Sequence, residues 1–298
     1  MITLTTPSAW QPHTTCAVAG MTDDAYRAAP GLTQSDLNRF AESPALFKYV
    51  ERQDTAAMSF GRALHSLLLE GQTRYVIKPE TYGPDEKPWH GAAKECKEWM
   101  ARHAGETVFS ADEADALECA VRHALAHETV AHLLNGAYKE LSVFGASKTG
   151  AAWGKGRMDA VNFRGDRVQV IDVKTTQDAR MSAFSKTILQ RGYHRQAAWY
   201  RRLIAQFIDK TVRFEFWFVA VEVDPIPRVN VWKLDEAAID YGDEEIHNLE
   251  EKLNECRTTG RWPDYHDKDI GLMNTIDLPK WVYGDETELS GMTKGAAA

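Results

Sequence analysis

The residues with the clearest capacity for chemistry lie on two segments that a turn connects. The first contains Gly156-Arg-Met-Asp159, and the second contains Asp172-Val-Lys174. Both segments alternate β-branched or aromatic side chains with others, and Arg164-Gly-Asp166 between them is typical of a tight turn. We therefore expect two antiparallel neighbouring strands that bring the carboxylates of Asp159 and Asp172 to one point.

Two converging carboxylates repel each other, and such a pair persists most readily when a hard divalent cation lies between them. The expected ion is Mg²⁺, with Mn²⁺ able to replace it. Asp172 and Lys174 are two residues apart on a strand, so they project to the same face and place an ammonium beside whatever the metal binds. This arrangement is suited to phosphoryl chemistry.

Taken singly, each of these residues has an ordinary structural explanation. An Asp at a strand end is usually a turn or solvent residue, and an Asp-x-Lys pair is often a surface ion pair. However, Asp172 and Lys174 interrupt the otherwise mostly apolar segment Val168–Val173, where an unpartnered charge would be costly to bury. The combination therefore indicates that something neutralises them.

The flanking sequence predicts a helical first half. Ser35 is a good N-cap for one short helix, and Ser43-Pro44 ends it and opens another. Apolar spacing predicts a helix over Ser59–Glu70 that Gly71 ends, with His65 beside its apolar face. Two further helices are expected over Lys94–His103 and Asp112–Leu134.

The second half has the pattern of an α/β core. Its predicted strands are the alternating segments Leu141–Phe144, Met158–Phe163 and Arg167–Val173, followed by a central strand over Val212–Val221. Its predicted helices are Ala179–Leu189, Tyr193–Ile208 and the acidic segment Asp235–Cys256. No internal repeat is visible.

The length of 298 residues suits one domain with extensions. We expect residues 1–30 to form a weakly ordered, loosely docked leader, residues 31–257 to form the domain, and residues 258–298 to form a C-terminal extension anchored by aromatic residues such as Trp262 and Trp281. The N-terminus lacks the pattern of a secretory signal, and no apolar stretch approaches the ~18–20 residues that span a bilayer. The expected compartment is the cytoplasm, without membrane contact.

The net charge of −8 argues by itself against nucleic acid as a partner, because binding phosphates requires Lys and Arg. The distribution of charge is more informative. Acidic residues are concentrated in Asp235–Glu255, whereas Lys174–Arg202 is strongly basic, so a basic surface near the site is possible. The basic residues are Lys174, Arg180, Lys186, Arg191, Arg195, Arg201 and Arg202.

The four cysteines, at positions 16, 96, 119 and 256, never form a C-x-x-C pair, which predicts free thiols. The spacing argues against a zinc ribbon and against a disulfide scaffold.

The motifs resemble those of the PD-(D/E)XK nuclease superfamily. Gly-x-x-Asp159, a strand, and then Asp172-x-Lys174 match its core, in the form of the RecB-type branch. Ser35-Asp-Leu-Asn with Ser43-Pro44, and Met58-Ser-Phe-Gly-Arg-Ala-Leu-His65, are similar to the RecE (exonuclease VIII) nuclease domain and its phage relatives. The resemblance runs from about Ser35 to Val221. It implies a restriction-endonuclease-like core, with a central mixed sheet flanked by helices and a helical N-terminal part.

The resemblance also implies roles for individual residues. His65, Asp159, Asp172 and the backbone carbonyl of Val173 match the metal ligands. Lys174 matches the lysine that orients the attacking water or stabilises charge on the phosphate. Gln196 and Tyr200, at i and i+4 of one helix face, match a Gln-x-x-x-Tyr motif beside the site.

These assignments have structural alternatives. His65 could be a flanking histidine capped by a neighbour, and its assignment depends mainly on the resemblance. Gln196 and Tyr200 could be ordinary packing partners. Glu140 precedes the sheet and could reach the metal, although a glutamate at a strand edge is usually solvated.

The activity implied by the resemblance is Mg²⁺-dependent exonuclease digestion of linear double-stranded DNA, 5′ to 3′, which leaves 3′ single strands for strand-annealing recombination. The implied partners are DNA ends, further copies of the chain in a ring (a tetramer rather than a trimer), and a RecT-like annealing protein. Such a ring would place the basic residues in a channel and the acidic helix outside.

An iron–sulfur cluster, which some RecB-like nucleases hold, is not expected, because only Cys256 follows the core. Two alternatives for the activity remain open. One is a RecB-like nuclease of other polarity or with single-strand or endonuclease activity, and the other is a non-catalytic module that binds DNA ends.

Overall fold

A six-stranded mixed sheet forms the centre of the computed structural model, which describes residues 4–51, 56–150, 152–208, 211–223 and 226–264. The strand order is β1-β6-β7-β8-β9-β10. Only β8 and β9 are parallel, and the other neighbours are antiparallel. The strands are β1 (Cys16–Val18), β6 (Tyr138–Ala146), β7 (Trp153–Arg164), β8 (Arg167–Thr176), β9 (Arg213–Glu222) and β10 (Val229–Lys233).

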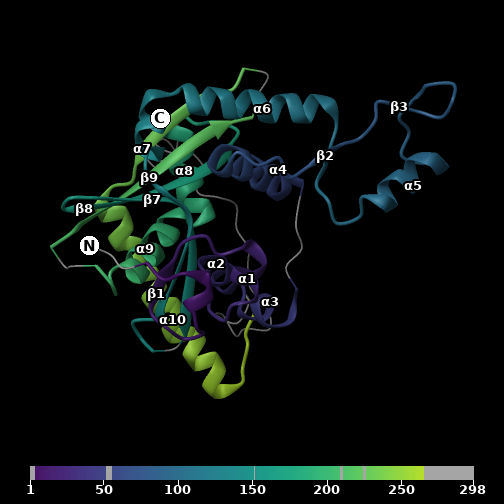
Figure 1. Cartoon of the computed structure of the whole chain (residues 1–298). Coiled ribbons are helices and arrows are strands. Elements are labelled where there is room, and N and C mark those ends of the chain that lie inside the picture. Colours follow the sequence, from purple (N-terminus) through teal and green to yellow (C-terminus); the bar gives the residue numbers. More distant parts are fainter. Residues whose placement is uncertain (1–3, 52–55, 151, 209–210, 224–225, 265–298) are drawn as a thin grey trace, which may run out of the picture.

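Helices cover both faces of this sheet (Figure 1). Alternation along β9 shows the two layers: Phe216 and Phe218 pack in one buried cluster, while Val219 and Val221 pack in the other. The first cluster includes residues of α2 (Gln34–Glu42), α8 (Met181–Arg191), α9 (Tyr193–Ile204) and α10 (Glu236–Thr259), and the second includes residues of α4 (Ala56–His65), α6 (Ala111–Ala126) and α7 (Glu128–Leu134). The predicted α/β class with a mixed sheet flanked by helices is confirmed.

The first short helices begin at capping residues. Helix α2 is capped by Thr33, whose hydroxyl accepts from the Asp36 backbone while the Asp36 carboxylate accepts from the Thr33 backbone. The prediction of Ser35 as the cap was therefore wrong, because this reciprocal pair satisfies two free N–H groups at once. Ser43 caps α3 (Pro44–Tyr49) as predicted.

Two predicted helices differ from the structure in their internal geometry. The segment predicted as one helix over Asp112–Leu134 is interrupted at His127, which has extended backbone and separates α6 from α7. Helix α4 ends at His65, and Ser66–Glu70 continues as a π-helical turn that Gly71 closes with a φ of +66°. A π-helical turn often marks a functional position.

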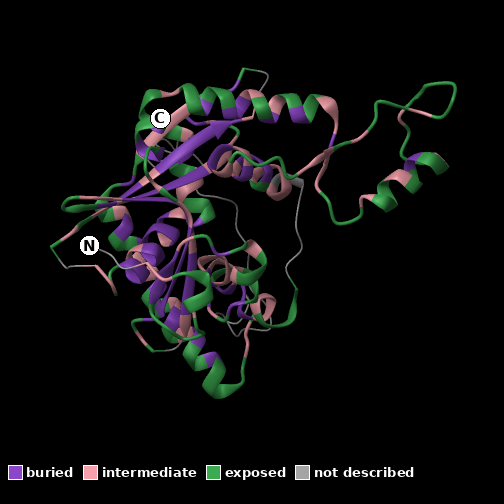
Figure 2. Cartoon of the chain, in the orientation of Figure 1, coloured by how far each residue is buried: buried purple, intermediate pink, exposed green. Residues whose placement is uncertain are grey.

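An arm, residues 78–106, projects away from the sheet (Figure 1), and Figure 2 shows that it is mostly exposed. It carries β3 (Thr81–Tyr82), β4 (Lys87–Pro88) and α5 (Lys94–Arg102), and the pair β2 (Val76–Ile77) and β5 (Val108–Phe109) joins it to the body. Trp99 stacks on His103 with ring centroids 3.9 Å apart, so the arm is stabilised partly by its own aromatic contacts.

The N-terminal segment departs from the expectation of a loosely docked leader. Strand β1 pairs with β6 and is buried, and helix α1 (Asp23–Ala28) follows it. The segment contains no periodic pattern, yet three buried residues are enough to add an edge strand to an existing sheet. At the other end, Trp262 stacks on Phe47, whereas Trp281 lies outside the described residues.

The four cysteines are free thiols, as predicted. Among the described helices, none has the length and apolar character needed to cross a bilayer.

Candidate metal centre

The candidate site lies where β7 and β8 separate. Their pairing begins at Arg164 and Arg167 beside the turn and ends at Ala160 and Ile171. Asp159 is the next residue of β7, and its Oδ2 accepts a hydrogen bond from the Val173 backbone N–H at 2.7 Å. The carboxylate therefore takes the place of a backbone partner at the point where the ladder opens.

Glu140 lies directly across from Asp159 on the other side of β7. The pairs Lys139–Ala160 and Leu141–Met158 flank this position. Glu140 has a φ of +49°, a left-handed conformation that costs a non-glycine residue about 1–2 kcal/mol. Such backbone strain is concentrated at functional sites. Here it accompanies a carboxylate beside Asp159.

His65 reaches the same place from the end of α4. Its Nε2 lies 2.8 Å from the carbonyl oxygen of Val173, and its Nδ1 lies 3.5 Å from Asp159 Oδ2. One potential ligand atom from each of His65, Glu140 and Asp159 lies within 4.8 Å of the other two. Three elements far apart in sequence thus converge on one point.

The donor set fits a divalent cation. It offers an imidazole nitrogen, two carboxylates and the Val173 carbonyl, which are ligands that Mg²⁺ and Mn²⁺ accept. Adjacent ligands of one octahedral ion, each bonded at about 2.1 Å, lie about 3 Å apart. In the structure, His65 Nε2 donates a hydrogen bond to the Val173 oxygen at 2.8 Å, so these two atoms already lie at about the distance that two neighbouring ligands would have once the proton is lost.

Asp172 and Lys174 lie on the α9 side of this point. Asp172 is 1% exposed, its Oδ2 is 2.6 Å from Lys174 Nζ, and its Oδ1 accepts from Gln196 Nε2 at 2.7 Å. Gln196 also donates to the Tyr200 hydroxyl, which in turn donates to the Arg157 backbone carbonyl. The structure therefore joins the predicted Asp, Lys, Gln and Tyr in one hydrogen-bonded chain.

Gly156 of the Gly-x-x-Asp motif permits this close approach of helix α9. A Cβ at Gly156 would lie 2.8 Å from a ring carbon of Tyr200, which is closer than van der Waals contact allows. The same helix places Tyr193 over Lys174, with Nζ 4.7 Å from the ring centroid. The glycine of the motif is therefore needed for α9 to pack against β7.

Without a cation, Asp159 and Glu140 bind protons more tightly than ordinary carboxylates do, whereas His65 binds a proton less tightly than an ordinary imidazole. Burial, and then the charge of Asp172, raise the pKa of Asp159 to about 8. Burial and the charge of Asp159 raise the pKa of Glu140 to about 7. Burial and then Lys174 lower the pKa of His65. A cation would stabilise the ionised form of these carboxylates, and a neutral imidazole is the form of histidine that binds metal.

Burial alone would lower the pKa of Lys174, but the combined attraction of Asp172, Tyr193 and Asp159 outweighs it, so this pKa lies above its usual value. The ammonium is therefore charged at neutral pH, as electrostatic stabilisation of a phosphate requires.

Two adjoining cavities give access to the site. One of about 320 Å³ is lined by His65 and Glu140, and the other, of about 460 Å³, is also lined by Glu140. Both include Arg74 and Arg157, and the smaller one adds Arg27 and Arg62. Asp23 and Glu70 also line both cavities and pair with Arg27 and Arg74, so the lining is mixed in charge.

The predicted basic surface along α9 is not what the structure shows. Arg201 pairs with Asp240, and Arg202 pairs with Asp243 of helix α10. Arg195 similarly faces Glu245. The basic and acidic segments attract each other and pack together, so the acidic helix covers these arginines instead of facing away from them. The acidic helix therefore does not face away from these three arginines, as the ring hypothesis expected, and the ring itself stays a prediction.

Sequence reasoning gave Glu140 little weight and missed Arg157 and Asp23. Arg157 Nε donates to Glu140 Oε2 at 2.7 Å, and its Nη1 lies 3.4 Å from Asp23 Oδ1. The position of Arg157 within the Gly-x-x-Asp motif was the one available signal. Asp23 offered none, because the segment that carries it lacks periodicity.

A family of known sequences matches most of this chain. The model of the PDDEXK-like domain of unknown function (DUF3799) matches residues 34–269. No curated protein matches the chain.

Solved structures add a likeness in fold. A crystal structure from Eubacterium rectale, described as a "Putative exonuclease", has a TM-score of 0.54 at 12% identity and covers 89% of this chain and 99% of its own. The crystal structure of SSO0001 has 17% identity and covers 63% of this chain and 86% of its own, but its TM-score of 0.25 is too low to compare folds.

Proposed function

This chain belongs to the PDDEXK-like domain family DUF3799, and on that premise we propose that it is a divalent-metal-dependent nuclease that hydrolyses phosphodiester bonds. The observation that carries the proposal is the convergence of His65, Glu140 and Asp159 beside the ion pair of Asp172 and Lys174. Membership of a PDDEXK-like family supports nuclease chemistry, and the arrangement of these five side chains supports them as the residues that carry it.

The proposed ligands are His65, Asp159, Asp172 and the Val173 carbonyl, with Glu140 as a further carboxylate. A bound Mg²⁺ would polarise the scissile phosphate and lower the pKa of a water molecule. Asp159 holds the ligand set to β8 through the Val173 backbone.

Lys174 supplies a charged ammonium at the α9 side of the centre, where it can stabilise the extra negative charge of the transition state. Gln196 fixes one oxygen of Asp172, and Tyr200 fixes Gln196. These two residues therefore hold Asp172 in the orientation that keeps its other oxygen on Lys174.

We further propose that the substrate is linear double-stranded DNA, cut from its ends 5′ to 3′ with Mg²⁺ to leave 3′ single strands for recombination. This finer assignment is supported by the resemblance of the His65 and Ser35 motifs to the RecE type. A homo-oligomeric ring, with a tetramer favoured, and a RecT-like annealing partner are proposed on the same ground. We propose that DNA phosphates bind at the cavities beside Glu140, where Arg27 and Arg74 would exchange their carboxylate partners Asp23 and Glu70 for phosphate oxygens.

The deciding experiment uses linear duplex DNA labelled at one 5′ or 3′ end, with Mg²⁺ and with chelator. We expect the label to be released only with Mg²⁺ and first from the 5′ end. Release from the 3′ end, cutting of circular DNA or preference for single strands would replace the proposed polarity or substrate with another nuclease activity. DNA binding without any cleavage would leave the non-catalytic module.

Variants test the residues. Lys174→Ala should reduce kcat by about 10²–10³-fold, the loss typical of removing one group that stabilises transition-state charge. Lys186→Ala, an exposed lysine of α8, is the matched control and should cut at the parental rate. A Lys174→Ala protein as fast as the parent would refute the nuclease assignment of this site.

A further inference from the structure

Helix α1 packs on the face of β7 that carries Asp159. Cβ atoms at Gly154 and Gly156 would collide with Trp199 and Tyr200 of α9, so these two positions face α9. Side chains alternate along a strand, and Lys155 and Arg157 therefore point to the opposite side. Asp159 follows in the same row and contacts His65.

Lys155 fastens the end of α1 to this row. Its buried Nζ donates to the backbone carbonyls of Tyr26, Arg27 and Ala29 at 3.1, 3.1 and 2.6 Å. These carbonyls belong to the last turn of α1 and to its C-cap Ala29, where helices leave carbonyls without intrahelical partners, although the Tyr26 carbonyl also accepts from the Ala29 backbone N–H. Lys155 thus sets the position of α1 over β7.

Arg157 connects α1 to the metal centre. Its side chain is 12% exposed and donates from Nε to Glu140 and from Nη1 to Asp23. The Tyr26 ring lies 5.7 Å from the centre of the same guanidinium. An arginine side chain loses considerable conformational entropy when it is held in one rotamer. Contacts with Asp23 and Tyr26 already restrict Arg157, so its contact with Glu140 costs less additional entropy.

Glu140 is the member of the cluster that most needs support. Its backbone is strained, and its carboxylate faces that of Asp159, which repels it. A strained residue persists only where its surroundings hold it. The Arg157 guanidinium is placed to do so, because it neutralises one Glu140 oxygen while the other remains available.

From these contacts we infer that Arg157 is a positioning residue for the metal centre, which holds Glu140 beside His65 and Asp159, and that helix α1 locks Arg157 through Asp23. The segment that precedes the family-matched region 34–269 is then a working part of the site. This inference builds on the proposed function, because it assigns a role toward the proposed cation.

Mn²⁺ binding measured by calorimetry, on the full chain without DNA, tests this role independently of cleavage. Arg157→Ala should weaken Mn²⁺ binding by about 10–100-fold, as loss of a partner that orients a ligand typically does. Arg157→Lys, which keeps the charge, should lose less. Asp23→Asn should weaken binding by a few fold, because Arg157 keeps its contact with Glu140 but loses its lock.

Asp24→Asn is the matched control for Asp23→Asn. Asp24 is the neighbouring acid in the first turn of α1 and is exposed, so its replacement should leave Mn²⁺ affinity unchanged. If both substitutions changed the Mn²⁺ affinity equally, the inference that Asp23 holds Arg157 in place would be wrong. Arg164→Ala removes another β7 arginine that binds backbone carbonyls far from the site, and circular dichroism of all variants separates misfolding from loss of affinity.

A double-mutant cycle decides whether Arg157 acts through Glu140. Glu140→Gln should weaken Mn²⁺ binding, and adding Arg157→Ala to it should then change the affinity by less than about 2-fold. A further loss as large as that in the parent would overturn the inference and assign Arg157 a separate role. A parent that binds Mn²⁺ as described but never cuts DNA would refute the proposed function and leave the positioning role intact.

Discussion

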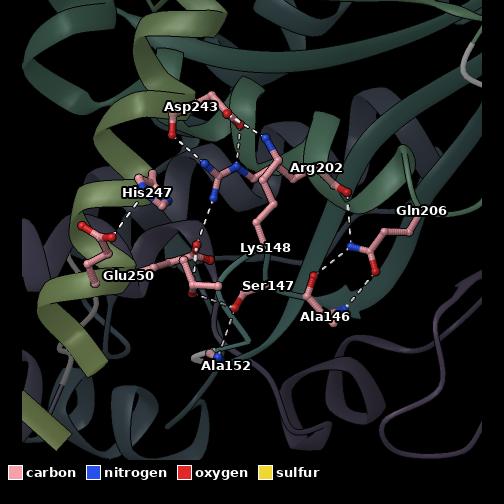
Figure 3. Close-up of polar contacts among 11 residues, drawn as sticks. Ala146, Ser147, Lys148, Ala152, Arg202, Gln206, Asp243, His247 and Glu250 are labelled. Atoms are coloured by element: carbon pink, nitrogen blue, oxygen red, sulfur yellow. Dashed lines mark hydrogen bonds and ion pairs between the residues drawn. The ribbon is translucent and has the colours of Figure 1, made fainter. Parts of the chain in front are cut away.

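Two polar clusters of the molecule use charge in different ways. One is the metal centre at the opening of β7 and β8. The other, the arginine cluster, consists of Arg202, Asp243, Glu250 and Lys148 (Figure 3). Arg202 donates to Asp243 and to the fully buried Glu250, and Lys148 binds Asp243 at 2.8 Å. The arginine cluster thus contains two cations for two carboxylates.

The balance of charge distinguishes the two clusters. Burial raises the pKa of Asp243, but Arg202 and Lys148 outweigh it and leave this pKa lowered. For Glu250, burial outweighs the attraction of Arg202 and leaves its pKa raised. At the metal centre Asp159 and Glu140 have pKa values of about 8 and 7. The arginine cluster fastens α10 and the β6–β7 connection to α9 through paired charges, whereas the metal centre brings together carboxylates that a cation would stabilise.

The largest expected effect is the loss of unfolding free energy when the arginine cluster loses Arg202. Arg202→Met leaves the fully buried Glu250 without its cation, while Asp243 keeps Lys148. Loss of one partner of a buried pair costs about 3–5 kcal/mol of unfolding free energy. Urea unfolding measures this loss, while Mn²⁺ affinity should remain parental. The neighbouring Arg201→Met removes a more exposed pair with Asp240 and should cost less than about 1 kcal/mol. Equal losses would contradict the distinction between the clusters.

The next effect concerns the pH dependence of stability in chelator. The folded protein binds the Asp159 proton with a pKa of about 8, against 3.8 ordinarily. Stability from this group is therefore fully present below about pH 4 and is lost as the pH rises through 8. Asp159→Asn should remove this loss, which is at most about 1.4 kcal/mol per pH unit for one proton. Urea unfolding at pH 5 and pH 8 measures it.

Asp178→Asn is the control for that measurement. Hydrogen bonds from Arg180 lower the pKa of Asp178 to about 2, so its titration lies below pH 4 and its replacement should leave the pH 5 to pH 8 difference unchanged. An Asp159→Asn protein with the parental pH dependence would show that the metal centre is not the source of the instability.

The smallest effect tests the strain at Glu140. Glycine adopts a positive φ without penalty, so Glu140→Gly should be more stable than Glu140→Ala by about 1 kcal/mol. At the adjacent Lys139, where φ is not positive, glycine should be the less stable replacement by about 0.5–1 kcal/mol. Thermal or urea unfolding of the four variants compares them, and the same sign at both positions would exclude backbone strain at Glu140.

Most of the regular elements followed from local sequence. Alternation and helical spacing indicated β6 to β9 and α8 to α10 within a few residues, because each is long and amphipathic or fully buried. Strands β1 and β10 and helix α1 were missed, since three to six residues carry no measurable period. Their formation depends on a sheet edge that already exists.

The sequence by itself determined that β7 and β8 are neighbouring antiparallel strands, because a short turn between two alternating segments predicts a hairpin. It also determined that Gln196 and Tyr200 share one helix face. Only the tertiary structure decided that Glu140 joins Asp159 through a strained backbone, that Arg157 and Asp23 support it, and that the acidic helix covers the arginines of α9. Such contacts join distant segments, and their energies depend on burial and on partners that no local pattern specifies.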